Sequence, residues 1–496
     1  MRVIDVLRSP RLLKTEVLAA LVVAIALIPE AISFSILAGV DPRLGLFASF
    51  TMAVTIAFTG GRPAMISAAT GAIALVIAPV AREHGVEYLI ATVLLGGVFQ
   101  VVLSFAGAGR LMRFVPRSVM VGFVNALAIL IFLAQLPQLF GEDIPWLVFP
   151  LVGAGLVIIF GLPRLTTLIP APLIAIVVIT AAVAWLGLDV PTVQDQGDLP
   201  RSLPSLFVPD VPFTLETFQI IAPYALAMAL VGLMESLMTA KLVDDITDTH
   251  SDKTREGVGQ GIANIVTGFF GGMGGCAMIG QTMINVKQGG ARSRASTFLA
   301  GIFLLVLVVG LGDLVGTIPM AVLVAVMIVV SISTMDWHSV DPRTLRMMPR
   351  SETTVMLVTV VATVWTHNLA IGVVLGSLTA MTMFARRVAH LTSIEKVWER
   401  DVDDDGIADV RRYRVTGELF FASSNDLVYQ FDYAGDPSTV IIDLSDADIW
   451  DASTVAALDA VQAKYRSLGK EAVISGLDGA SLDRLDRLSG RLGKGH

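Results

Sequence analysis

The sequence predicts an α-helical polytopic membrane protein: fourteen transmembrane segments in a 7+7 inverted repeat, followed by a small cytoplasmic α/β domain. Three observations support this fold class: the composition, a series of apolar stretches, and two short segments that nearly repeat each other. Of the 496 residues, 54% are hydrophobic and 16% are charged, whereas charged residues make up about a quarter of a soluble domain. The chain is therefore too apolar for a soluble protein.

Apolar stretches long enough to cross a bilayer recur along most of the chain. They occupy residues 14–38, 43–60, 62–80, 88–108, 115–137, 145–162, 167–188, 217–241, 256–272, 274–288, 296–316, 317–333, 351–368 and 369–388. The first stretch is too long for a signal peptide and has no small-residue cleavage site, so we expect it to remain as a helix.

Basic residues indicate the orientation, because loops rich in Lys and Arg stay in the cytoplasm. Such residues precede the first span and follow the even-numbered spans: Arg2, Arg8, Arg11, Lys14, Arg62, Arg110, Arg113, Arg117, Arg164, Lys253, Arg255, Arg292, Arg294, Arg343, Arg346, Arg350, Arg386 and Arg387. The other loops hold little beyond Arg43, Arg82 and Arg201. We expect a multi-pass protein of the inner (plasma) membrane with both termini in the cytoplasm.

An internal repeat pairs GGRPAMIS at residues 60–67 with GGCAMIG at residues 274–280. Five extended residues cover roughly 16 Å and ten helical residues roughly 15 Å, which together match a hydrocarbon core of about 30 Å. We therefore expect one helix to start at mid-membrane near Ala68. A second helix should start near Gly280 or Gln281 and arrive from the opposite face.

Two helix N-termini that face each other bring unpaired N–H groups and partial positive charge to one place, which suits an anion. Gln281 and Thr282 can add side-chain donors there. The alternative interpretation is a pair of kinked helices packed by small residues.

Two glutamates lie inside otherwise apolar segments, Glu30 in LIPEAIS and Glu235 in LMESLMT. A carboxylate at mid-membrane costs roughly 2.5–3.5 kcal/mol and usually faces a cavity or a partner. Thr239 shares a helix face with Glu235, so this pair can hold Na⁺, or Glu235 can carry a proton; otherwise Glu235 is structural. Glu30 shares a face with Phe34 and is either a proton site, a hydrogen-bonding group beside the anion, or a structural residue.

The composition becomes polar near residue 392, where strands alternating with helices predict an α/β domain. The expected elements are a hairpin and another strand within 397–421, a helix at Ser424–Phe431, a strand at 439–444, a helix at Ser453–Ser467, a strand at 471–476 and a final amphipathic helix. We place the transmembrane domain at 1–391, with repeats at about 14–188 and 217–388, and the tail domain at 392–496.

Several classes of function are excluded or disfavoured. The net charge of −8 argues against a nucleic-acid partner, and the single cysteine excludes an internal disulfide and a multi-cysteine metal site. We interpret this residue, Cys276, as a small side chain that lets two backbones approach. No nucleophile–base constellation appears, and His338 and His367 lie near span ends. We expect that the protein is not an enzyme and binds no cofactor. A coupling ion, Na⁺ or H⁺, is expected instead.

Three segments resemble the SulP family of sulfate-permease-type anion transporters, which end in a STAS domain. They are IPEAISFSILAGVDPRLGLFASF at 28–50, GGCAMIGQTMINVKQGGARSR at 274–294 and IIDLSDADIWDAST at 441–454. The resemblance covers essentially the whole chain. It implies a substrate-carrying core and a gate, elevator-like movement of the core, and a homodimer in the lipid membrane.

The resemblance also implies site residues. The substrate-binding set is Glu30, Phe34, Ala68, Ala69, Thr70, Gly280, Gln281 and Thr282, and the coupling-cation set is Glu235 and Thr239. Many members have glutamine in place of Glu30, and animal members often have arginine in place of Gln281. Without that arginine the site relies on dipoles, hydroxyls and a bound cation, which favours cation-coupled uptake over exchange.

The tail contains two further motifs. Residues 451–454 resemble the anti-sigma-factor-antagonist loop in which the serine, here Ser453, is phosphorylated; the alternative is that Ser453 caps a helix. Residues 401–406 resemble the opening of a calcium loop, but Arg412 occupies the position of the bidentate glutamate. We expect a solvated acidic hairpin there.

Together these features favour a secondary active importer of a small anion such as bicarbonate, sulfate or a dicarboxylate like fumarate, driven by Na⁺ or H⁺. An anion exchanger and a passive anion channel are alternatives. A nucleobase permease and a membrane sensor fit less well, because the tail and the first-span motif disfavour the former and a sensor needs no paired helix starts.

Overall fold

The computed structural model describes residues 3–107, 109, 115–141, 144–164, 170–197, 199–200, 202–389, 392–400, 410–477 and 479–490. The chain separates into two compact units, Met1–Ser377 and Leu378–His496. The expected domain boundary near residue 392 stays a prediction.

The first unit is built from helices in two halves that show the same order of elements. The first half contains α1 (Val3–Leu7), α2 (Pro10–Ala38), α3 (Pro42–Thr59), β1 (Ser67–Ala68), α4 (Gly71–His84), α5 (Val86–Phe105), α7 (Arg117–Leu133), α8 (Leu136–Phe140), α9 (Val148–Gly161), η2 (Leu162–Arg164) and α10 (Ala171–Leu186). After η3 (Val193–Gln196), the second half contains α11 (Leu215–Thr247), α12 (Lys253–Phe269), β2 (Cys276–Ala277), α13 (Ile279–Met283), the π-helix η4 (Ile284–Gln288), α14 (Arg294–Gly316), α15 (Met320–Thr334), α16 (Trp337–Val340), α17 (Pro342–Met347), α18 (Arg350–Thr366) and the start of α19 (Leu369–Ala389), which continues into the second unit from Leu378. In each half, two long helices are followed by a two-residue strand, a short helix and then further long helices.

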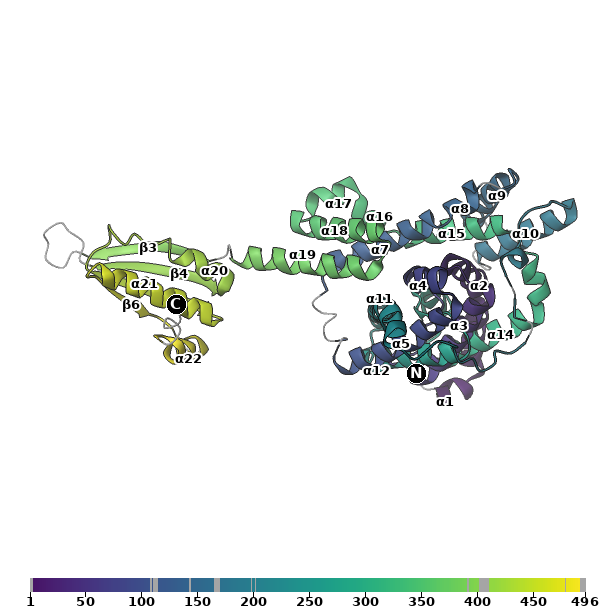
Figure 1. The fold of residues 1–496 in the computed structure, drawn as a ribbon, viewed down its shortest axis with the longest axis horizontal. Coiled ribbons are helices and arrows are strands. Elements are labelled where there is room, and N and C mark those ends of the chain that lie inside the picture. Colours follow the sequence, from purple (N-terminus) through teal and green to yellow (C-terminus); the bar gives the residue numbers. More distant parts are fainter. Residues whose placement is uncertain are drawn as a thin grey trace. The chain divides into compact units, whose positions relative to one another are not determined.

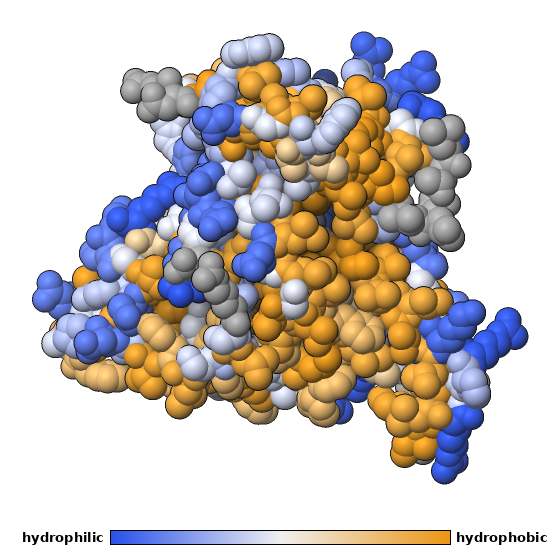
Figure 2. All heavy atoms as spheres, turned by 90° about the vertical axis from the view of Figure 1, so that its right-hand side faces the viewer, coloured by the Kyte–Doolittle hydropathy of each residue, from blue (hydrophilic) through white to orange (hydrophobic). Residues whose placement is uncertain are grey.

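These helices have the composition of membrane spans. Seven helices of the described residues are long and apolar enough to cross a bilayer: Pro10–Ala38, Pro42–Thr59, Val86–Phe105, Arg117–Phe140, Leu215–Thr247, Arg294–Gly316 and Leu369–Val388. Each of the fourteen predicted segments overlaps a helix, and the number that crosses the membrane stays a prediction. Figure 2 shows apolar side chains spread over one broad face, as a lipid-facing surface requires.

The helices of the first unit pack in two groups (Figure 1). A core group consists of α2, α3, α4, α5, α11, α12 and α14, and a gate group of α7, α9, α10, α15 and α18. The groups meet where α2 contacts α15 and α10 and where α4 contacts α7. That these two groups act as a substrate-carrying core and a gate stays a prediction.

The two repeated segments cross at the centre of the core group. β1 and β2 pair antiparallel, with Ser67 opposite Ala277 and Ala68 opposite Cys276. A Cβ at Gly275 would lie 2.1 Å from the backbone oxygen of Ala68, so glycine is required for this approach. Because the strands run in opposite directions, α4 and α13 lead away from the crossing in opposite directions. Both repeated segments therefore lead into helices that start close to this crossing, and the position of these starts at mid-membrane stays a prediction.

The start of α4 differs from the prediction. Ala68 belongs to the strand, and the helix begins three residues later, at Gly71. The reason is that Thr70 keeps an extended backbone and caps the helix, its Oγ1 accepting from the Ile73 N–H at 3.4 Å. Thr70 was expected to belong to the start of this helix, and it is instead the N-cap that precedes α4.

The start of α13 also differs, by one residue. It begins at Ile279 rather than at Gly280, because the extended backbone ends at Met278. After Met283 the helix continues with π geometry to Gln288.

The second unit contains a four-stranded sheet of order β3–β4–β5–β6. Its elements are β3 (Ser393–Arg400), β4 (Val410–Leu419), α20 (Phe421–Leu427), β5 (Thr439–Ile449), α21 (Ala452–Ser467), β6 (Glu471–Ser475) and α22 (Gly479–Leu488). β3 is antiparallel to β4, and β4, β5 and β6 are parallel. The α/β prediction and the hairpin are confirmed. The further strand expected before residue 421 is absent from the described residues, because β4 runs unbroken through Gly417.

Candidate functional site

A cavity of about 150 Å³ lies beside the crossing of β1 and β2. Residues of the core helices α2, α4 and α11 line it on one side, and residues of the gate helices α7 and α15 line it on the other. Five of the predicted site residues border it: Glu30, Phe34, Thr70, Glu235 and Gly280. The structure thus brings together residues from both halves of the chain.

The starts of both α13 and α4 border this cavity, and the ring of Phe34 narrows the space at α4. A Cβ added at Gly280 would meet no atom within 4 Å. A Cβ at Gly71 would lie 2.9 Å from the ring of Phe34. The aromatic ring therefore packs on α4, and the first turn of α13 borders free space in which its backbone N–H groups can meet a ligand.

Glu30 and Gln281 are 251 residues apart in sequence and lie in direct contact. The Gln281 Nε2 donates to Glu30 Oε1 at 2.7 Å. The Gln281 Oε1 is buried and has no hydrogen-bond partner among the described residues. Gln281 was expected to donate to the anion, but its amide instead binds the carboxyl group at the edge of the cavity.

Glu235 reaches the same cavity from α11 and is 8% exposed. The Cys276 Sγ donates to Glu235 Oε2 at 2.9 Å and lies 3.1 Å from the Thr70 Oγ1. Cys276 thus joins Glu235 to the N-cap of α4. The interpretation of Cys276 as a small residue missed this contact, because nothing in the sequence indicates which side chain the thiol meets.

The remaining predicted residues are buried near the crossing but do not line the cavity. Ala68 and Ala69 belong to the extended segment before α4. The Thr239 Oγ1 donates to the backbone oxygen one turn earlier, at 2.8 Å. The Thr282 Oγ1 accepts from the Ile66 N–H at 3.0 Å. The Thr239 hydroxyl gives its proton to the backbone and keeps the lone pairs of its oxygen, so a cation site at Glu235 and Thr239 stays a prediction.

Two further glutamates support the crossing, and the sequence analysis did not single them out. Glu256 of α12 is fully buried. Its carboxylate accepts from the N–H groups of Gly61 and Arg62, both at 2.8 Å, and from the Gln260 Nε2 at 2.9 Å. It therefore supplies hydrogen-bond acceptors to the backbone N–H groups of the segment that leads into β1.

Glu16 of α2 likewise supplies hydrogen-bond acceptors to backbone N–H groups, here in the segment that follows η4. This 1% exposed residue accepts from the N–H groups of Arg292, Ser293 and Ser296 at 2.8, 3.0 and 3.1 Å and from the Ser293 Oγ at 2.8 Å. Irregular backbone in a membrane needs such partners, because no water is present to supply them.

The comparison with known families now identifies the chain. The Sulfate permease family matches residues 13–145 and 143–359. The chain belongs to this family. A STAS domain matches residues 401–489. The resemblance seen in the sequence is therefore confirmed: this is a SulP-family anion transporter with a C-terminal STAS domain, and not an enzyme.

Similar proteins extend over almost the whole chain. The "Putative sulfate transporter YbaR" of Bacillus subtilis is 50% identical over 477 residues, covering 96% of this chain and 97% of that protein. The "Bicarbonate transporter BicA" of Picosynechococcus sp. is 23% identical over 527 residues, covering 96% and 91%.

Solved structures confirm the fold. The structure of murine Slc26a9 in the inward-facing state has a TM-score of 0.80 at 18% identity and covers 95% of this chain and 87% of that chain. The transmembrane domain of a cyanobacterial BicA has a TM-score of 0.66 at 24% identity, covering 73% and 98%. The SulP chain is thus a multi-pass membrane protein with this helical fold.

The two tail motifs have different outcomes. Asp451, not Ser453, caps α21: its Oδ1 accepts from the Thr454 N–H at 3.1 Å. The N-cap interpretation of Ser453 is wrong, because the helix already begins at Ala452 and Ser453 is an exposed residue of its first turn. A regulatory role for Ser453 stays a prediction. The acidic segment 401–406 lies outside the described residues.

Proposed function

We propose that this protein is a secondary active importer of a small oxyanion, with sulfate as the first candidate and bicarbonate as the second. The observation that carries the proposal is the antiparallel crossing of β1 and β2 beside a cavity, since two helix starts then face one small volume. The relatives named as sulfate and bicarbonate transporters support this choice of substrates.

The anion binds at the open first turn of α13 and at the capped start of α4. Backbone N–H groups attract it without a full positive charge. Glu30 borders the same cavity, and an ionised carboxylate there repels an anion. We infer that Glu30 carries a proton when the anion is bound, while the Gln281 amide holds its other oxygen.

Glu235 is the residue we assign to the coupling cation. It reaches the cavity and has one hydrogen-bond donor among the described residues, the Cys276 thiol. A carboxylate with so few donors can take up H⁺ or bind Na⁺ as the anion enters, which compensates the negative charge of the substrate. The Thr239 hydroxyl donates its proton to the backbone oxygen of Glu235, so Thr239 contributes to a cation site through the lone pairs of its oxygen.

Transport requires access from both sides. The central cavity shares Val124, Met238 and Ile279 with a cavity of about 550 Å³ that also contains Arg117 of α7 and Lys241 of α11. In the expected orientation, with both termini in the cytoplasm of a plasma-membrane protein, this second cavity faces the cytoplasm. We infer an elevator-like movement of the core group past the gate group, within the homodimer that the family resemblance implies.

Uptake into proteoliposomes tests the proposal. Purified protein would be supplied with labelled sulfate, bicarbonate or fumarate under imposed Na⁺ or H⁺ gradients. We expect sulfate to accumulate above its equilibrium level when one of the gradients is present. Equilibration at the same rate with and without a gradient would instead identify a channel, and anion movement only in exchange for an internal anion would identify an exchanger.

A further inference from the structure

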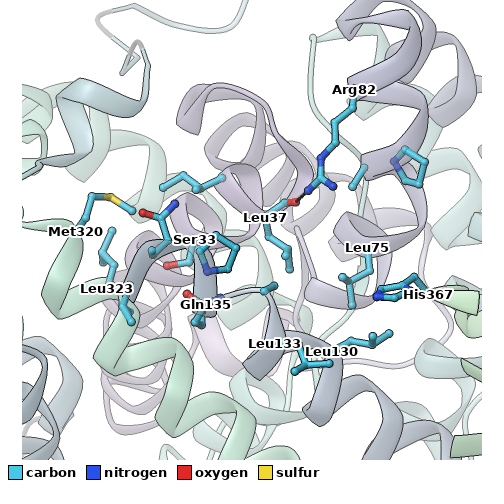
Figure 3. A pocket seen from close by; sticks show the side chains of 17 residues that line it. Ser33, Leu37, Leu75, Arg82, Leu130, Leu133, Gln135, Met320, Leu323 and His367 are labelled. Atoms are coloured by element: carbon cyan, nitrogen blue, oxygen red, sulfur yellow. Dashed lines mark hydrogen bonds between the residues drawn. The ribbon is translucent and has the colours of Figure 1, made fainter. Parts of the chain in front are cut away.

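A third cavity, of about 470 Å³, lies at the other end of the same helices (Figure 3). It is bordered by the C-terminal parts of α2, α4 and α7 and by the N-terminal part of α15. It shares no lining residue with the central cavity. In the expected orientation it opens to the outside, so an anion taken up from the medium meets it first.

The charge of this outer cavity comes from one side chain. Arg82 is the one Asp, Glu, Lys or Arg among the described residues that line it. The other polar groups in its wall are neutral amides and a hydroxyl, from Gln135, Gln138 and Ser33, and the imidazole of His367. The rest of the wall is apolar, and a single cation between apolar walls concentrates a positive potential.

Arg82 is exposed, and among the described residues its donors have few partners. Its Nη2 donates to the backbone oxygen of Leu37 at 3.4 Å, a long hydrogen bond. None of the ion pairs among the described residues involves Arg82. Figure 3 shows the side chain extending from α4 towards Leu37, with its guanidinium directed into the cavity. A guanidinium offers five N–H donors in a planar fork that fits an oxyanion, so most of this capacity is free.

The cavity at the cytoplasmic end differs in charge. Its wall contains Arg117 and Lys241 but also Asp245 and Asp336, so its formal charges cancel. The two ends therefore treat an anion differently: the outer cavity attracts it, and the inner cavity holds it less strongly.

We propose that the outer cavity is an anion-capture site in which the guanidinium of Arg82 binds the substrate oxyanion before it enters the central cavity. This inference rests on the proposed function and on the expected orientation. Arg82 is then a positioning residue for uptake, acting on the external side alone.

Sidedness of the kinetics tests this role. In proteoliposomes of known orientation, Arg82→Gln should raise the KM for external sulfate by about 10-fold, the effect of losing one charge-assisted hydrogen bond. The maximal rate and the KM for internal sulfate should stay unchanged, and Arg82→Lys should restore part of the loss. Arg43→Gln is the control, because Arg43 lies in the first turn of α3, pairs with Asp41 at 3.2 Å and does not line the cavity.

Chemical rescue gives a second readout that a merely structural role would not change. Cys276 is the chain's one cysteine and is fully buried, so Arg82→Cys introduces a uniquely accessible thiol. External treatment with a cationic ethylammonium methanethiosulfonate should restore the low KM, whereas the anionic ethylsulfonate reagent should not.

The outcomes separate the two proposals. A wild-type protein that carries none of the tested anions overturns both of them. A wild-type protein that transports sulfate while Arg82→Gln leaves the external KM unchanged, or raises the external and internal KM equally, overturns the capture site alone. Equal rescue by the two reagents also contradicts it.

Discussion

Two pairs of glutamates inside the membrane unit differ in how their carboxylates are paired. Glu16 and Glu256 each accept three or four hydrogen bonds, mostly from backbone N–H groups, and line none of the three cavities described above. Glu30 and Glu235 each have one side-chain donor and border the central cavity. A carboxylate saturated with donors stabilises one backbone geometry. A carboxylate with spare oxygen lone pairs beside a cavity can change its partner, and this is what transport needs.

The largest effect should come from removing a saturated carboxylate. Glu256→Ala removes the acceptor of the part-buried Gly61 N–H and of the buried Arg62 N–H, and the buried group alone costs about 1–3 kcal/mol. The melting temperature in detergent and the yield of folded protein should both fall. Glu216→Ala, at an exposed glutamate of α11, is the control and should leave both unchanged. An equally stable Glu256→Ala variant would contradict the structural role.

Glu235→Gln should show the opposite behaviour. The amide keeps the shape of the side chain, so the melting temperature should change little. Gradient-driven accumulation of sulfate should fall by at least about 10-fold, because an amide neither ionises nor binds a cation strongly. Full gradient dependence in this variant would remove Glu235 from the coupling step.

Glu30→Gln should change the response to pH rather than the total activity. An anion beside Glu30 favours the protonated carboxyl, so wild-type uptake should increase as the external pH falls. Glutamine imitates the neutral form and still accepts from the Gln281 amide, so the variant should be active with a flat pH profile. A wild-type profile without any pH dependence would rule out Glu30 as a proton site.

The tail contains a third carboxylate with several donors, Asp436. The contribution of its tyrosine partners to stability should be lost only at alkaline pH. Asp436 accepts from the Arg411 Nη1 at 2.8 Å and from the Tyr413 and Tyr465 hydroxyls. Burial raises the pKa of Tyr413 to about 12 and raises that of Tyr465 further. The folded state favours the neutral phenols, so their contribution is complete below the unfolded tyrosine pKa of about 10 and is lost as the pH rises towards the folded values.

Thermal unfolding of a 392–496 fragment measures this loss and also tests the predicted domain boundary. The melting temperature should be constant near neutral pH and should fall above pH of about 10. Tyr413→Phe should make the fall shallower, whereas Tyr429→Phe, at an 82% exposed tyrosine, should not alter it.

The sequence was informative wherever a local pattern repeated. The duplicated AMI segments predicted the extended stretches and the opposed helix starts, because the length of a half-membrane helix follows from residue counts alone. The helix starts were misplaced by one to three residues. For α4 the reason is that Thr70 keeps an extended backbone and acts as the N-cap, and residue counts do not indicate that conformation. Five of the predicted residues border the cavity, and two of them, Glu30 and Glu235, stood out because intramembrane carboxylates are rare.

Contacts between distant residues could not be read from a single sequence. The Gln281–Glu30 and Cys276–Glu235 hydrogen bonds depend on how the two halves pack. The roles of Glu16 and Glu256 were equally hidden, because a glutamate near a helix end is usually solvated and nothing local indicates the backbone it will pair with. Thr239 shares the helix face of Glu235 but does not line the central cavity, and its role at a cation site stays a prediction.

The pairing of β1 with β2 has a consequence for selectivity. Only two residues of each strand pair, and Gly275 leaves no slack between the backbones. The strand pairing therefore fixes how close the two helix starts lie to each other, independently of the side chains that line the cavity. We expect discrimination among oxyanions to follow ionic size, with bulky competitors rejected by exclusion and not by weaker hydrogen bonding.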